Sequence, residues 1–266
     1  MQFEKITNQD LAFLNPLQPE GWGEIVPAFE FYLDSPVCFP VKTTIDQKIA
    51  GIGAAIILKD TAWLAHIIVN HQNRKQGIGG AITAHLLDIT REQGCKTVSL
   101  IATDLGRPVY KKAGFADQDD YVFYEREAPL VNGNTSADIA ICREEHRAVI
   151  LELDRALSGE TRGCLLEPKL DGAYVHKSNG KIDGYFIPNL GEGLVMAEND
   201  RAGLELLKLK LSCSNKNVLP AGNGRGMAFM RENGFKETKR AKRMVRGQRF
   251  GWHPEKLFGR IAGNLG

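Results

Sequence analysis

The fold is decided by residues 67–81, which read IIVNHQNRKQGIGGA. An apolar segment, Ile67–Val69, runs into a polar loop with glycines, and residues 78–93 then place apolar side chains at helical spacing. We expect a buried strand, a loop and a helix that begins at Ile78. The first N–H groups of a helix lack partners inside it, and the helix dipole is positive there. The stretch therefore predicts an anion site.

The residues of this loop suit a phosphate or pyrophosphate. Glycines let the backbone approach the anion closely, and Arg74 and Lys75 add positive charge at the rim. Two better-known phosphate loops do not fit. A nucleoside-triphosphate loop ends in Gly-Lys-Ser/Thr, whereas residues 79–81 read GGA. A dinucleotide-binding loop needs a further glycine at the position of Ile82.

The flanking segments predict a mixed α/β domain. Residues 49–58 and 61–69 are apolar and predict two strands joined by a short turn at Lys59-Asp60. After the loop and its helix, residues 97–102 predict another strand, and residues 107–112 predict a short helix that ends before Gly114.

The second half carries a weak repeat of the first. GRPVYKKAGF at 106–115 aligns with GMAFMRENGF at 226–235, and each copy follows a helix and a strand. We therefore expect two related α/β halves. Helices are expected at 140–157 and 201–211, with strands at 172–176, 184–187 and 193–197. The polar, turn-prone segment 131–137 is the expected linker between domains at 1–130 and 138–266.

Composition is that of an ordinary globular protein. The chain has 266 residues, of which 43% are apolar and 25% charged. A formal net charge of +2 favours neither nucleic acid nor membrane as a partner. No apolar run has the length of a signal peptide or a membrane span, so we expect a cytoplasmic protein. The five scattered cysteines contain no Cys-x-x-Cys pair, which predicts free thiols and no metal site.

The hexapeptide Arg74-Lys75-Gln76-Gly77-Ile78-Gly79 resembles the signature of the GCN5-related N-acetyltransferases (GNAT): Arg or Gln, two free positions, Gly, one free position, then Gly or Ala. Tyr110, followed by Gly114-Phe115, stands where this family has a tyrosine in a short helix. The second half resembles a degenerate acetyltransferase-like domain that follows the catalytic domain in some members. The resemblance implies two tandem GNAT-like domains, each with a central mixed sheet flanked by helices.

The resemblance also implies acetyl-CoA as co-substrate and assigns roles to residues. The pantetheine arm would add as a strand along Ile67, Ile68 and Val69. The pyrophosphate would lie on the loop, at Arg74, Lys75, Gln76, Gly77, Ile78, Gly79 and Gly80. The Val69 N–H would polarise the thioester carbonyl, and Tyr110 would protonate the leaving thiolate. A neutral amine would attack directly, without a covalent enzyme intermediate. One departure is Thr103, where the family often has an asparagine that contacts the cofactor.

The acceptor side is less clear from the sequence. In the family an early helix and loop wall the acceptor pocket, which here implies Trp22, Glu24, Phe29 and Tyr32 as substrate-binding residues. A plain core role for these aromatic residues stays open. Glu20, Glu24, Glu30, Asp34 and His66 are candidate bases. Strand alternation puts His66 on the face opposite Val69, and a structural role for this histidine also stays open.

The second half lacks these catalytic features, because Met230 replaces the tyrosine and Glu198-Asn199-Asp200 replaces the cationic loop. We expect it to bind no CoA and to cover the acceptor side. The sequence thus predicts an N-acetyltransferase that acts on a small, amino-acid-like amine, as a monomer or homodimer. Two alternatives remain: a protein or peptide acceptor, and an acetyl-CoA-binding sensor without turnover.

Overall fold

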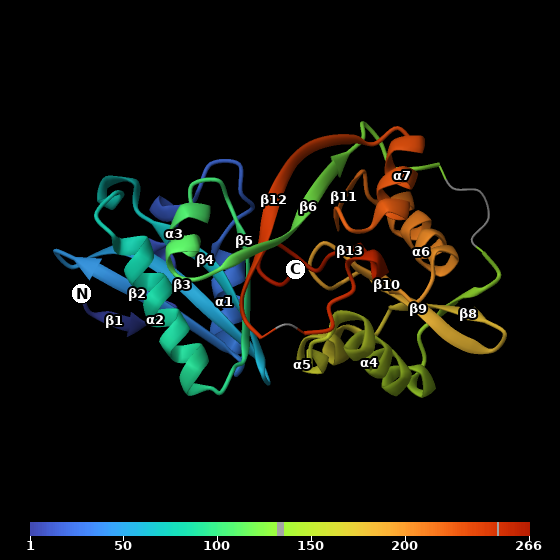
Figure 1. Cartoon of the computed structure of the whole chain (residues 1–266), viewed down its shortest axis with the longest axis horizontal. Coiled ribbons are helices and arrows are strands. Elements are labelled where there is room, and N and C mark those ends of the chain that lie inside the picture. The colour runs from blue at the N-terminus through green and yellow to red at the C-terminus, as the bar shows by residue number, and fades with distance from the viewer. Residues whose placement is uncertain (132–135, 249) are drawn as a thin grey trace. The chain divides into compact units, whose positions relative to one another are not determined.

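The computed structural model describes residues 1–131, 136–248 and 250–266, and the chain divides into two compact units (Figure 1). Unit 1 comprises Met1–Asp117 and Met244–Gln248, and unit 2 comprises Gln118–Arg243 and Arg249–Gly266. This division differs from the expected boundaries, because 118–130 group with unit 2 and 244–248 with unit 1. Within the expected linker, residues 132–135 lie outside the described residues.

Unit 1 is a mixed sheet with helices. Its strands follow one another across the sheet in chain order: β1 (Phe3–Lys5), β2 (Cys38–Ile45), β3 (Lys48–Leu58), β4 (Thr61–Val69) and β5 (Thr97–Ala102). β1 to β4 pair antiparallel, β4 and β5 pair parallel, and β12 (Lys236–Gly247) lies next to β5. The helices are α1 (Val26–Asp34), α2 (Ile78–Glu92) and α3 (Arg107–Lys112), with short 3-10 turns at Asn8–Phe13, Asn15–Leu17 and His71–Asn73.

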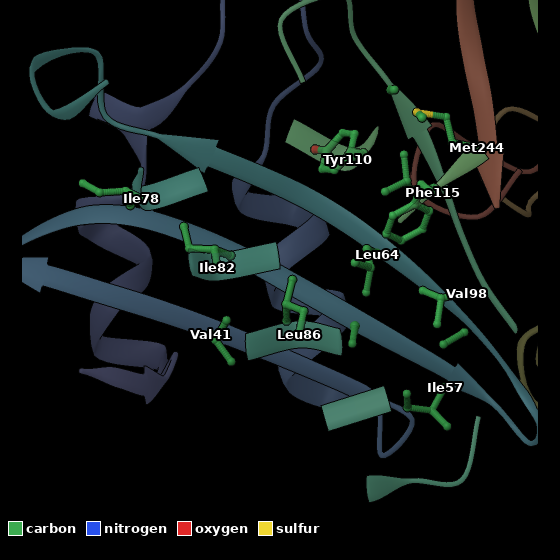
Figure 2. Close-up of a cluster of buried hydrophobic side chains, with 14 of the residues drawn as sticks. Val41, Ile57, Leu64, Ile78, Ile82, Leu86, Val98, Tyr110, Phe115 and Met244 are labelled. Atoms are coloured by element: carbon green, nitrogen blue, oxygen red, sulfur yellow. The ribbon is translucent and has the colours of Figure 1, made fainter. Parts of the chain in front are cut away.

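Helix α2 packs closely on β3 because the strand has glycine where the helix crosses it. A Cβ atom at Gly53 would lie 2.9 Å from Ile82 Cγ2 and 3.0 Å from Leu86 Cδ1. Figure 2 shows the core cluster of unit 1, to which α2 contributes Ile78, Ile82 and Leu86. This contact fixes the start of α2, and with it the glycine-rich loop, relative to the sheet.

Unit 2 is also built from sheet and helix. β6 (Ala116–Glu125) pairs antiparallel with β11 (Lys216–Pro220) and lies next to β12. A five-stranded antiparallel sheet has the order β13 (Leu257–Gly259), β10 (Leu194–Ala197), β9 (Lys181–Ile187), β8 (Tyr174–Ser178) and β7 (Ile139–Ile141). The helices are α4 (Glu144–Ser158), α5 (Gly163–Leu166), α6 (Asp200–Cys213) and α7 (Gly224–Glu232), with 3-10 turns at Glu167–Lys169 and Pro254–Lys256.

The mixed α/β class expected from the sequence is confirmed in both units. The expected helix at 140–157 is wrong in its first turn, because β7 pairs with β8 through Ile139–Ile141 and α4 begins only at Glu144. At these residues, pairing with β8, which lies farther along the chain, outweighs the local helical pattern. Among the described residues, no helix is both long and apolar enough to cross a membrane.

Candidate active site

One edge of β4 is open in unit 1. β4 pairs with β5 only over Thr61–Trp63, opposite Thr97–Ser99, yet it continues to Val69. Within the described residues, Leu64–Val69 therefore has no strand partner on the side of β5. Unpaired backbone N–H and C=O groups at a strand edge are able to bind an extended ligand as an added strand.

A bulge in β4 sets the direction of its side chains. Ile52 of β3 pairs with Ile68 and Ala54 pairs with Ala65, so β4 has one more residue than β3 between these pairs. His66 lies in this bulge with φ of +47°, in the left-handed region.

The bulge turns His66 to the face opposite Leu64, while His66 and Val69 lie on opposite faces as simple alternation predicts. Leu64, Ile67 and Val69 all belong to the core cluster with α2, whereas His66 contacts Tyr32 of α1. Counted by alternation from Leu64, His66 would have pointed into the core cluster.

The loop after β4 ends in an open helix N-terminus. Asn70 Oδ1 accepts a hydrogen bond from the Gln72 N–H at 3.1 Å, and Gly77 stands before α2 with φ of +81° and no side-chain cap. The first hydrogen bond of α2 runs from Ala81 N to the Gly77 carbonyl oxygen, at 3.0 Å. In the described part of the chain, the three N–H groups of residues 78–80 donate no hydrogen bond to a protein acceptor. They are free to bind an anion.

The start of α2 lies near both β4 and α3. A Cβ atom at Gly79 would lie 3.5 Å from Val69 Cγ2, and one at Gly80 would lie 4.0 Å from Val109 Cγ1, next to Tyr110. The structure thus brings together the expected cofactor-binding residues of the strand and the loop. The exposed side chains of residues 74–76 flank this helix start and include Arg74, whose Nε lies 3.4 Å from the Val69 carbonyl oxygen.

Tyr110 is held in α3 in its protonated form. Its side chain is buried, and burial raises the pKa of the phenol to about 12. The ring packs edge-on against Phe115 at 6.1 Å between centroids (Figure 2). Gly106, which has no side chain, leaves room for the ring. None of the described residues forms a hydrogen bond to the hydroxyl. Tyr110 is therefore a neutral donor at physiological pH.

Three of the four expected acceptor residues meet around His66. The rings of Trp22, Phe29 and Tyr32 lie 6.0, 5.8 and 5.7 Å from the imidazole, centroid to centroid. Tyr32 Oη lies 2.7 Å from His66 Nδ1. Burial lowers the pKa of His66 to about 4, so the imidazole is neutral at physiological pH. Phe29 and Tyr32 are buried, and Trp22 is 41% exposed.

The acidic candidates all have exposed side chains. Glu24 is exposed and, within the described residues, makes no hydrogen bond or ion pair. Glu20, Glu30 and Asp34 are exposed as well.

The loop before α1 is held by Gln18, for which no sequence pattern predicts a role. Its side chain donates to the carbonyl oxygens of Trp22 at 3.3 Å and Gly23 at 2.9 Å, and accepts from the Ile25 N–H at 3.0 Å. Thr103, at the position of the family's asparagine, instead accepts a hydrogen bond from the Gly106 N–H at 3.2 Å as α3 begins.

One group of possible metal ligands occurs in the described residues, and it lies in unit 2. Asp138, His176 and Glu205 have their ligand atoms within 4.8 Å of one another. Arg201 bonds both carboxylates, at 2.5 Å to Asp138 and 3.2 Å to Glu205, and His176 Nδ1 lies 2.6 Å from Asp183 Oδ1. Protein partners thus satisfy this group as an ion-pair network.

Comparison with known proteins agrees with this geometry. Residues 14–132 match the family model of the acetyltransferase (GNAT) domain. No protein of curated function has a significantly similar sequence.

Solved structures extend the likeness to the whole chain. A putative acetyltransferase from Pyrococcus horikoshii is 20% identical with a TM-score of 0.83, over 100% of this chain and 95% of that one. A tandem GNAT protein from the clavulanic acid biosynthesis pathway is 15% identical with a TM-score of 0.64, over 92% and 98%. A GCN5-related N-acetyltransferase from Anabaena variabilis is 12% identical with a TM-score of 0.60, over 92% and 72%. Residues 14–132 thus match an acetyltransferase (GNAT) domain, and the chain as a whole has the fold of a tandem GNAT protein.

Proposed function

We propose that the protein transfers an acetyl group from acetyl-CoA to the primary amine of a small, amino-acid-like metabolite. The observation that carries the proposal is the open edge of β4, which leads directly into the open N-terminus of α2. The edge at Ile67–Val69 has no strand partner on the side of β5 among the described residues, which suits a pantetheine arm. Residues 74–80 have N–H groups and the cations Arg74 and Lys75 for a pyrophosphate. One ligand that combines both chemistries is a coenzyme A thioester.

The transfer follows from the groups around that edge. The amine nitrogen attacks the thioester carbonyl carbon, and the Val69 N–H stabilises the negative charge that develops on the carbonyl oxygen. The C–S bond then breaks, and the Tyr110 hydroxyl donates a hydrogen bond to the thiolate as it leaves and passes it a proton, which solvent returns to Tyr110. The attacking nitrogen loses a proton to solvent, and the products are the acetylated amine and coenzyme A.

The aromatic group around His66 supports an acceptor site on the face of β4 opposite helix α2. Trp22 is partly exposed there, while Phe29 and Tyr32 form a buried wall behind the imidazole. A neutral imidazole among aromatic rings suits an amine that must be uncharged to react. The proposal places the reaction in a reducing cytoplasm, which agrees with the thiol form of all five cysteines.

A thiol-release assay with a broad panel of amines and amino-acid derivatives tests the proposal. Gly79→Glu and Gly79→Gln are a matched pair, because a Cβ atom there meets only Val69 at an ordinary 3.5 Å and the two variants differ in charge alone. A carboxylate about 5 Å from a phosphate charge costs roughly 3 kcal/mol, or about 200-fold in acetyl-CoA affinity.

We expect turnover with a small amine for the wild type and for Gly79→Gln, and its loss for Gly79→Glu. Turnover with peptides alone would replace the proposed acceptor with a protein. Acetyl-CoA binding without transfer to any amine would support the sensor. Equal activity of the two variants would remove the pyrophosphate from this loop.

A further inference from the structure

We propose that strand β13 occupies the groove of unit 2, by which we mean the space between β10 and β11 that corresponds to the open edge of β4 beside β5 in unit 1. The inference rests on the function proposed above and adds that one chain binds one acetyl-CoA. β10, α6, β11 and α7 of unit 2 follow one another along the chain as β4, α2, β5 and α3 do in unit 1. The sequence repeat supports this correspondence, because its copies at 106–115 and 226–235 contain α3 and most of α7.

β13 lies between β10 and β11, the counterparts of the two strands that separate in unit 1. It pairs antiparallel with β10 on one side. On the other side, the Val218 carbonyl oxygen of β11 accepts from Arg260 N at 3.1 Å, and Asn217 Nδ2 donates to the Phe258 carbonyl oxygen at 2.9 Å. In unit 1, β4 and β5 have no such strand between them after Trp63 in the described residues. The backbone groups that an extended ligand would use are thus already bonded in unit 2.

The helix N-terminus in unit 2 is closed as well. The Asn199 side chain caps α6 and accepts a hydrogen bond from the Ala202 N–H at 3.0 Å, whereas α2 begins after Gly77 with no side-chain cap. Asp200 adds a negative charge in the first turn of α6. A side-chain cap and an acid at this position oppose binding of a pyrophosphate.

Both sides of the contact between α6 and β13 have a glycine, which leaves room for the strand against the helix. A Cβ atom at Gly203 of α6 would lie only 2.1 Å from Cε2 of Phe258, so the ring occupies the space of the missing side chain. One at Gly259 would lie 2.8 Å from Lys210 Nζ. Phe258 is fully buried in the core cluster of unit 2. The inserted strand is therefore part of the core, and an added ligand would have to displace it.

Catalytic chemistry is missing at the same place. Met230 stands in α7 where Tyr110 stands in α3, and it is fully buried. A thioether has no acidic hydrogen to donate to a thiolate. Among the residues that the structure describes, the second unit thus lacks the open strand edge, the open helix end and the proton donor.

Isothermal titration with acetyl-CoA, together with hydrogen exchange on the same full-length protein, tests the inference. We expect one equivalent bound, with new protection at residues 67–69 and 75–80 and none at 194–203. Before acetyl-CoA is added, the Arg260 amide should already exchange as slowly as core amides, because it is bonded to Val218.

The outcomes separate the inference from the proposed function. Failure of the wild type to bind acetyl-CoA would contradict the function proposed for unit 1. Two equivalents, or ligand-induced protection at 194–203, would overturn the filled groove and leave the function of unit 1 intact. Rapid exchange of the Arg260 amide in the free protein would overturn it as well.

Discussion

Replacing Tyr110 with phenylalanine removes one hydroxyl oxygen from the proposed site and little else. The buried ring packs against Phe115 and over Gly106, and phenylalanine keeps these contacts. Since the hydroxyl has no hydrogen-bond partner among the described residues, no buried group loses its partner in the variant. We expect the free energy of unfolding to change by less than about 1.5 kcal/mol, and acetyl-CoA affinity to stay within a few-fold of wild type.

The effect on turnover follows from the acidity of the phenol. Burial raises the pKa of Tyr110 to about 12, above that of an ordinary thiol, so its main contribution is a hydrogen bond to the thiolate as negative charge develops. A hydrogen bond to a charged group contributes about 1.5–3 kcal/mol. If it forms only in the transition state, kcat/KM should fall roughly 10- to 150-fold in the variant.

The measurement is steady-state thiol release for wild type and Tyr110→Phe between pH 7 and 10, with acetyl-CoA affinity measured separately by calorimetry. Because the phenol with its pKa of about 12 stays protonated throughout, the ratio of the two rates should be constant over this range. An unchanged kcat/KM would remove Tyr110 from the mechanism. A ratio that falls towards one by pH 9 would show that the phenol titrates near that pH and would refute the argument from burial.

Three further predictions concern the stability of unit 1, each measured by urea unfolding. Gly53→Val should lower the free energy of unfolding by about 1–3 kcal/mol, because its Cβ would lie 3.0 Å from Leu86 Cδ1, and unchanged stability would mean that α2 packs less closely on β3. Gly247→Ala should lower the free energy of unfolding by at least about 1–3 kcal/mol, because alanine is strained at a φ of +102°. Its Cβ would also lie 2.1 Å from the Lys96 carbonyl oxygen. An unchanged free energy of unfolding would contradict the placement of this strand end. Lowering the pH from 7 to 4 should lower the free energy of unfolding by about 2–3 kcal/mol through His66. Burial lowers the pKa of this histidine from 6.5 to about 4, so the unfolded chain binds the proton at a higher pH than the folded chain does. His66→Gln should flatten that pH dependence, and an equally steep loss in the variant would assign it to other groups.

Much of unit 1 could be predicted because its signals are local. The expected strands at 61–69 and 97–102 and the expected helix at 107–112 have the observed bounds, and the helix expected at 78–93 differs from α2 by one residue at its end. Each element carries its own apolar pattern, and glycine marks where the helices begin or end. The proximity of the glycine-rich loop to α3 could be expected only from the family resemblance.

The acceptor side was predicted less well, because its geometry depends on a bulge and on a loop. Trp22, Phe29 and Tyr32 come together at His66, where the extra residue in β4 turns the imidazole towards α1. No local pattern in the sequence announces a bulge in a strand that is apolar on both faces. Glu24, which was selected for its charge, is exposed and forms no hydrogen bond or ion pair with the described residues.

The sequence by itself determined the glycine-rich cationic loop, the tyrosine with its Gly-Phe partner, and the repeat that relates the two halves, because short-range chemistry and spacing decide these features. Only the tertiary structure decided that 244–248 belong to unit 1 and that β13 fills the groove of unit 2. β13 follows its partner β10 by about 60 residues, and strand pairing at that separation leaves no periodic trace in either segment. Backbone hydrogen bonds and the fit of Phe258 against Gly203 select it, and these exist only once the chain has folded.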